Sequence, residues 1–177
     1  MSGINFLSNN LYNTATPTLT TGTENAQFPI LNLVNDSPSV KFRSTGNTVV
    51  LELDLLQVRN IDTLTVAGDP TEPFGMTAVT YKTSVTTDFS GSPINTLTLD
   101  PSQSLGYSYI TLVNHRFVEI TFTGQGSCVQ VGKIFVGERI NLSQNNLSIA
   151  SFNYEYSDKS DTNESAYGQK FINERLK

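Results

Sequence analysis

Apolar and polar residues alternate along much of the chain, which is the pattern of β-strands with one buried face. The clearest run covers residues 49–56, where valine and leucine occupy every second position and Glu52 and Asp54 fall between them. Residues 78–83 and 116–123 repeat the alternation. The residues predicted to form the core lie on the inward faces of such strands: Leu51, Leu53, Leu55, Leu64, Val66, Val118, Ile120, Phe122, Ile134 and Val136.

Turn-forming residues divide the alternating runs into short elements. Residues 60–62 predict a turn after the first run, and residues 114–115 predict the turn of a hairpin between 107–113 and 116–123. A proline in residues 28–34 disfavours a central strand, so this segment is a short helical turn or an edge segment. About eight short antiparallel strands with almost no helical periodicity predict an all-β fold, a β-sandwich or jelly roll.

The two ends of the chain differ from its middle. We expect residues 1–27 to form a first strand and an extended polar segment, residues 28–156 the sandwich, and residues 157–177 a C-terminal arm. The end of the arm, residues 166–177, is predicted to form a short exposed helix. Its apolar positions would make a narrow stripe on that helix: Tyr167, Phe171, Ile172 and Leu176. The stripe is expected to dock on another subunit; the alternatives are that it folds back onto its own sheet or that the arm is a solvated tail.

Charge and cysteine content exclude several classes of partner. The formal net charge is −5 and the 11 basic residues are scattered, which argues against nucleic acid or an anionic membrane as partner. Cys128 is the only cysteine, so it is either a small buried side chain or a reactive thiol, and no intrachain disulfide forms. Residues 1–5 lack the basic and apolar regions of a signal peptide, which favours a protein made in the cytoplasm.

No constellation of catalytic residues is visible in the chain. His115 is the only histidine, and the hairpin prediction places it in an exposed turn. A catalytic triad and a zinc site are therefore not expected. Glu52 and Asp54 alternate outward as solvated strand residues do, without the setting of a glycosidase acid pair. We predict a protein that is not an enzyme and needs no cofactor, with a calcium ion held by loop carboxylates as an open alternative.

The order of several motifs resembles a known family. Residues 31–44 (LNLVNDSPSVKFRS) followed by residues 50–64 are similar to the discoidin or galactose-binding-like jelly roll. Residues 116–122 (RFVEITF) and 129–137 (VQVGKIFVG) resemble its last two strands, the second in the form found in tailed-bacteriophage virion proteins. Phe42 stands where many relatives carry tryptophan, and the disulfide of the eukaryotic members is absent, which fits the phage branch.

The resemblance implies a function in assembly. We expect a structural protein of a tailed-phage virion, in the tail, the baseplate or the capsid decoration, that contacts other virion proteins and forms a homo-oligomer. Such a protein would be made in the host cytoplasm and reside in the virion. The alternative is a carbohydrate-binding module that recognises glycans on the host cell surface, because the superfamily includes glycan binders and the fold alone does not decide function.

Ligand-binding relatives use loops at one end of the sandwich, and the corresponding loops here are residues 35–39, 68–75 and 85–95. Phe74 and Phe89 would stack on a sugar ring or, alternatively, anchor their own loops to the core. The candidate ligand-binding residues are Asp36, Asp69, Glu72, Phe74, Asp88 and Phe89.

Overall fold

The computed structural model describes residues 4–7, 9–34, 40–68, 76–100, 104–124, 128–142, 161–164 and 170–173. The chain divides into a large unit, Asn5–Asn141, and a small unit that combines Met1–Ile4 with Leu142–Lys177. The elements in chain order are β1 (Ile4–Leu7), the 3-10 helix η1 (Leu11–Thr14), β2 (Thr16–Thr21), the 3-10 helix η2 (Ile30–Val34), β3 (Phe42–Arg43), β4 (Thr48–Ala67), β5 (Met76–Ser84), β6 (Asn95–Asp100), β7 (Leu105–Gly124), β8 (Gln130–Val131), β9 (Lys133–Gly137), β10 (Arg139–Leu142), β11 (Asp161–Glu164) and β12 (Lys170–Asn173).

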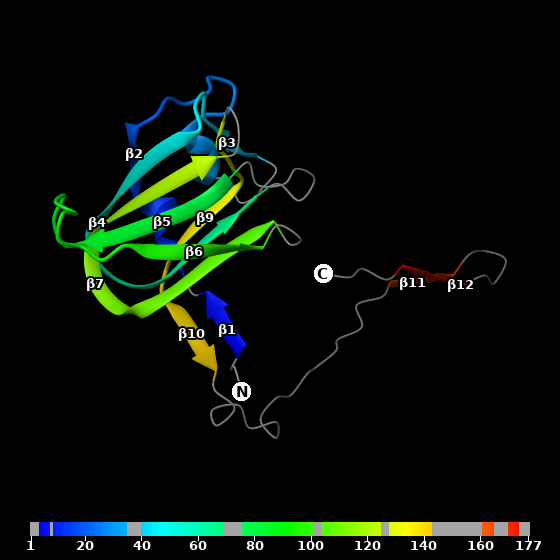
Figure 1. Cartoon of the computed structure of the whole chain (residues 1–177). Coiled ribbons are helices and arrows are strands. Elements are labelled where there is room, and N and C mark those ends of the chain that lie inside the picture. Colours follow the sequence, from blue (N-terminus) through cyan, green and yellow to red (C-terminus); the bar gives the residue numbers. More distant parts are fainter. Residues whose placement is uncertain are drawn as a thin grey trace. The chain divides into compact units, whose positions relative to one another are not determined.

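Two strands of 20 residues each, β4 and β7, form the framework of the large unit and pair antiparallel along most of their length. The first part of β4 lies between β2 and the second part of β7, which β5 extends. The last part of β4 lies between β9 and the first part of β7, which β6 extends. Figure 1 shows both long strands curving through the molecule. The fold is therefore an antiparallel jelly roll whose central strands contribute to both layers.

The two predicted turns in this framework are wrong. Residues 60–62 lie inside β4 and residues 114–115 lie inside β7, and Asn60 pairs directly with Asn114. The register between the strands shifts between Asp54 and Arg59, so several residues of β4 oppose few of β7. Such a bulge bends a strand pair without reversing the chain, and turn-forming residues are tolerated at the bend because they are exposed there.

All ten residues predicted to form the core are buried and belong to one cluster. The cluster also contains aromatic residues outside the regular alternation, among them Tyr12 and Phe42. The Tyr12 hydroxyl is buried without a hydrogen-bond partner among the described residues, and burial raises the pKa of this phenol far above its ordinary value. Phe42 fills the position of the family's tryptophan with a fully buried ring.

The segment before residue 28 is an integral part of the large unit and not an extended polar connection. Strand β2 pairs with β4, and η1 buries Leu11 and Tyr12. Asn10 caps η1, since its side-chain oxygen accepts hydrogen bonds from Tyr12 N at 3.1 Å and Val136 N at 3.1 Å. Its side-chain nitrogen donates to Ile134 O at 2.8 Å. Polar composition concealed this role because the asparagine satisfies backbone groups of β9.

The described part of the small unit is a strand pair and not a helix. β11 and β12 pair antiparallel, with Thr162 opposite Ile172 and Asn163 opposite Phe171. Threonine, isoleucine and phenylalanine favour strands, and a helix of three turns is marginal without tertiary contacts. Tyr167 and Leu176 lie outside the described residues. Docking of this arm on another subunit remains a prediction.

The bend in β4 brings together an ion pair that alternation did not predict. Arg116 Nε donates to Asp54 Oδ1 and Arg116 Nη2 to Asp54 Oδ2, each at 2.7 Å. The Arg116 hydrogen bond lowers the pKa of the Asp54 carboxyl. Folding therefore favours the ionised carboxylate, and the pair stabilises the protein above the ordinary carboxyl pKa. This contribution is lost as the pH falls through the lowered folded-state pKa.

Replacing Asp54 with asparagine is accordingly expected to lower stability modestly near neutral pH, because both side chains remain partly exposed. The difference from wild type should vanish at acidic pH below the folded-state pKa of Asp54. Urea denaturation at both pH values measures it. Glu52→Gln is the matched control, since Glu52 makes no ion pair within the described ranges. A stability difference that persists in acid would contradict this account.

Candidate functional site

The structure separates the predicted ligand-binding residues into two groups. Asp36, Asp69, Glu72 and Phe74 lie outside the described residues and stay predictions. Phe89, in the loop between β5 and β6, is only 6% exposed, so its ring anchors its own loop and is not offered for stacking on a sugar.

The neighbouring Asp88 has a local structural role. Its carboxylate accepts a hydrogen bond from Ser90 N at 2.9 Å, which lowers the pKa of the carboxyl. Its backbone oxygen accepts a hydrogen bond from Ser84 Oγ at 3.1 Å. These contacts hold the loop in shape.

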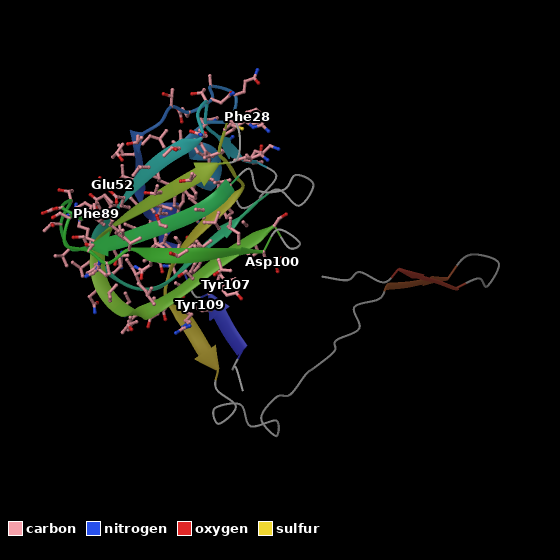
Figure 2. All side chains as sticks on the ribbon, viewed as in Figure 1. Phe28, Glu52, Phe89, Asp100, Tyr107 and Tyr109 are labelled. Carbon is pink, nitrogen blue, oxygen red and sulfur yellow. The ribbon has the colours of Figure 1, made fainter. Side chains whose placement is uncertain are left out.

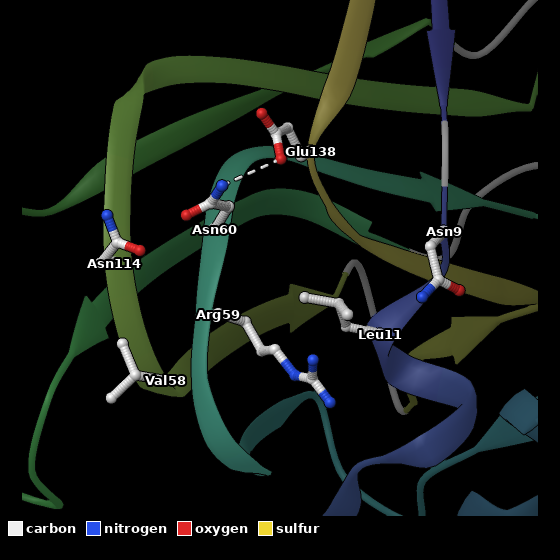
Figure 3. A pocket seen from close by; sticks show the side chains of 7 residues that line it. All are labelled: Asn9, Leu11, Val58, Arg59, Asn60, Asn114 and Glu138. Carbon is white, nitrogen blue, oxygen red and sulfur yellow. Dashed lines mark hydrogen bonds between the residues drawn. The ribbon is translucent and has the colours of Figure 1, made fainter.

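A concave site lies at the bend of β4 and β7, where sequence analysis placed two turns. The cavity has a volume of about 350 Å³. Four segments contribute to it: the residues at the start of η1, the bulge of β4, the facing part of β7 and the link between β9 and β10 (Figure 3). Its lining consists of Asn9, Leu11, Val58, Arg59, Asn60, Asn114 and Glu138.

The bend positions the polar groups of this pocket. Asn60 and Asn114 are register partners on β4 and β7. Asn60 Nδ2 donates a hydrogen bond to Glu138 Oε2 at 3.1 Å, which orients the carboxylate over the cavity. Leu11 is buried and Val58 is exposed, so the pocket combines an apolar floor with an apolar rim.

Several side chains in the pocket retain hydrogen-bonding capacity. Asn9, Arg59 and Asn114 are exposed and make no side-chain hydrogen bond with other described residues. Amides both donate and accept, a guanidinium donates from five N–H groups, and a carboxylate accepts. Planar groups of these kinds around a small apolar surface can hold a ligand rich in hydroxyl groups.

Catalytic and metal-binding groups do not accompany the pocket. No cluster of three histidine, cysteine or acidic residues that could hold a metal ion occurs in the described ranges. His115 is half-buried in β7, with Nδ1 2.8 Å from Thr83 Oγ1, and not in an exposed turn. No helix in the part of the chain that the structure describes is long and apolar enough to cross a membrane.

A second surface feature, a pair of exposed tyrosines on β7, was missed in the sequence. Tyr107 and Tyr109 are 47% and 41% exposed, and their ring centroids lie 5.6 Å apart. Figure 2 shows both on the same part of β7. The available signal was their spacing of two residues, which places them on one face of a strand.

No protein-family model and no curated protein matches the chain. Solved structures share its fold. A carbohydrate-binding module from Clostridium perfringens in complex with GalNAc-β-1,3-galactose has a TM-score of 0.58 at 13% identity, with 73% of this chain and 100% of that chain covered. The lectin domain of lectinolysin complexed with Lewis B antigen has a TM-score of 0.60 at 8% identity, covering 74% of this chain and 97% of that chain. An F-lectin from striped bass (Morone saxatilis) serum has a TM-score of 0.60 at 12% identity, covering 76% and 48%. The chain therefore has the galactose-binding-like jelly-roll fold of such carbohydrate-binding modules and lectins.

Proposed function

We propose that the chain is a non-catalytic carbohydrate-binding domain whose pocket at the β4–β7 bend holds the end of a glycan. The observation that carries this proposal is the pocket lining, in which unpartnered amides and the Arg59 guanidinium surround Leu11 and Val58. Sugars present hydroxyl groups at their edges and C–H groups on their ring faces, which suits this lining. The shared fold supports the proposal, because proteins similar to this chain were solved with glycans bound.

Two earlier predictions remain beside this proposal. The loop residues outside the described ranges are an alternative location for a glycan site, with Phe74 as its aromatic residue. A structural role in a tailed-phage virion is compatible with sugar binding, since a particle protein can also bind host glycans. It stays a prediction from sequence motifs, because no comparison bears on phage origin.

Replacing Arg59 with alanine is expected to weaken glycan binding by roughly tenfold or more, because a hydrogen bond from a charged donor contributes about 1.5–3 kcal/mol. Isothermal titration calorimetry with GalNAc-β-1,3-galactose and with the Lewis b antigen measures the change. Lys82→Ala is the charge-matched control, since Lys82 pairs with Glu119 on the sheet and does not line the pocket.

The two possible failures of this test have different meanings. If the wild-type chain binds neither probe nor any member of a broad glycan array, the proposed function is wrong. If it binds and Arg59→Ala has no effect, the glycan lies elsewhere, and Phe74→Ala then tests the loop site.

A further inference from the structure

We propose that Tyr107 and Tyr109 form a second sugar-binding subsite, on the face of the sheet, that stacks against the pyranose rings of a neutral glycan. This inference deepens the proposed function and rests on it. The pocket at the bend and the tyrosine pair use different side chains, so a glycan can engage either one or both.

The ring pair offers a stacking surface. The two rings are 5.6 Å apart between centroids and tilted by 40°, so they form a shallow V and not a closed stack. Both rings are more than two-fifths exposed, although aromatic side chains usually bury most of their area. Neither hydroxyl makes a hydrogen bond within the described part of the chain. An exposed ring with a free hydroxyl can contact the C–H face of a sugar and hydrogen-bond to its edge.

The protein holds one of the rings in place. The Arg139 guanidinium lies 4.5 Å from the Tyr109 ring centroid, and Arg139 Nε lies 3.2 Å from Asp62 Oδ2. Asp62 is buried, and its Oδ1 accepts hydrogen bonds from Arg139 N at 2.9 Å and from Thr63 Oγ1 at 2.7 Å. A buried carboxylate thus orients an arginine that packs on an exposed ring. Such support is typical of preorganised binding groups, and it makes Arg139 a positioning residue.

The surroundings favour a neutral sugar over other ligands. In the strand register Tyr107 lies between Thr65 and Thr98, so hydroxyl groups border the ring on both sides. The charge of Arg139 is committed to Asp62. Asp100, at the end of β6 on the side toward Tyr107 in Figure 2, disfavours an anionic ligand. Hydroxyl groups around a flat apolar ring complement a pyranose, whose edges are polar and whose faces are not.

The test compares four chains: wild type, the double variant Tyr107→Ala/Tyr109→Ala, Arg59→Ala, and Ile94→Ala as an exposed apolar control outside both sites. Each is titrated with GalNAc-β-1,3-galactose and with the Lewis b antigen. The chain has no tryptophan, so quenching of tyrosine emission reports contact directly. Light scattering gives the oligomeric state and circular dichroism the fold.

We expect the double variant to stay folded, to keep the oligomeric state of wild type and to bind roughly three- to tenfold more weakly, the range for one aromatic contact. Tyr107→Phe should keep most of the affinity. Tyr107→Ala, which changes the more exposed ring alone, replaces the double variant if that one unfolds.

Three outcomes would overturn the subsite. Full affinity in the tyrosine variants with weaker binding in Arg59→Ala removes the subsite and leaves the proposed function. A change of oligomeric state in the tyrosine variants assigns the face to a second copy of the chain. The absence of binding by wild type overturns both proposals together.

Discussion

Truncating Phe122 to alanine is expected to lower the free energy of unfolding by about 3–5 kcal/mol, the range for removing a buried phenylalanine. The ring is fully buried, and Phe122 pairs with Val49 of β4 on one side and Val79 of β5 on the other. Its loss leaves a cavity at the centre of three strands that cannot close, since each strand is held in register by its neighbours. Urea denaturation followed by circular dichroism measures the change.

The control for this truncation is Val85→Ala, because Val85 is 56% exposed and follows the end of β5. Its effect should stay within about 0.5 kcal/mol. A Phe122→Ala variant as stable as the control would mean that the layers can collapse onto the cavity, and that the long strands are less rigid than their pairing indicates.

Placing a methyl group on Gly137 is expected to destabilise the fold by about 1–3 kcal/mol or more, the range for overpacking. A Cβ at this position would lie 2.4 Å from the backbone oxygen of Asn9, which cannot move without displacing the start of η1. Asn9 lines the pocket, so Gly137→Ala should also weaken glycan binding. Thermal denaturation and titration calorimetry measure the two effects.

Gly46→Ala is the matched control, because a Cβ there would meet nothing within 4 Å. It should leave both stability and binding nearly unchanged. Wild-type glycan affinity in a destabilised Gly137→Ala chain would place the sugar away from the Asn9 side of the pocket.

The sequence by itself determined the all-β class and the inward face of the main strands. Leu51, Leu53 and Phe122 could be assigned to the core because side chains alternate between the faces of a strand, a local rule that holds whatever the strand pairs with. Helical periodicity at the C-terminal end, by contrast, rested on two spacings of four residues. Such a short pattern does not separate a helix from a strand pair when β-forming residues are present.

Only the tertiary structure decided where the chain bends and what gathers there. Asn60 and Asn114 have the composition of turns, yet pairing between β4 and β7 carries both strands through these positions, since one bulge satisfies the backbone at lower cost than two reversals. The pocket joins Asn9 to Glu138 from opposite ends of the large unit. No local pattern encodes that proximity. It follows from strand register, which the whole core determines at once.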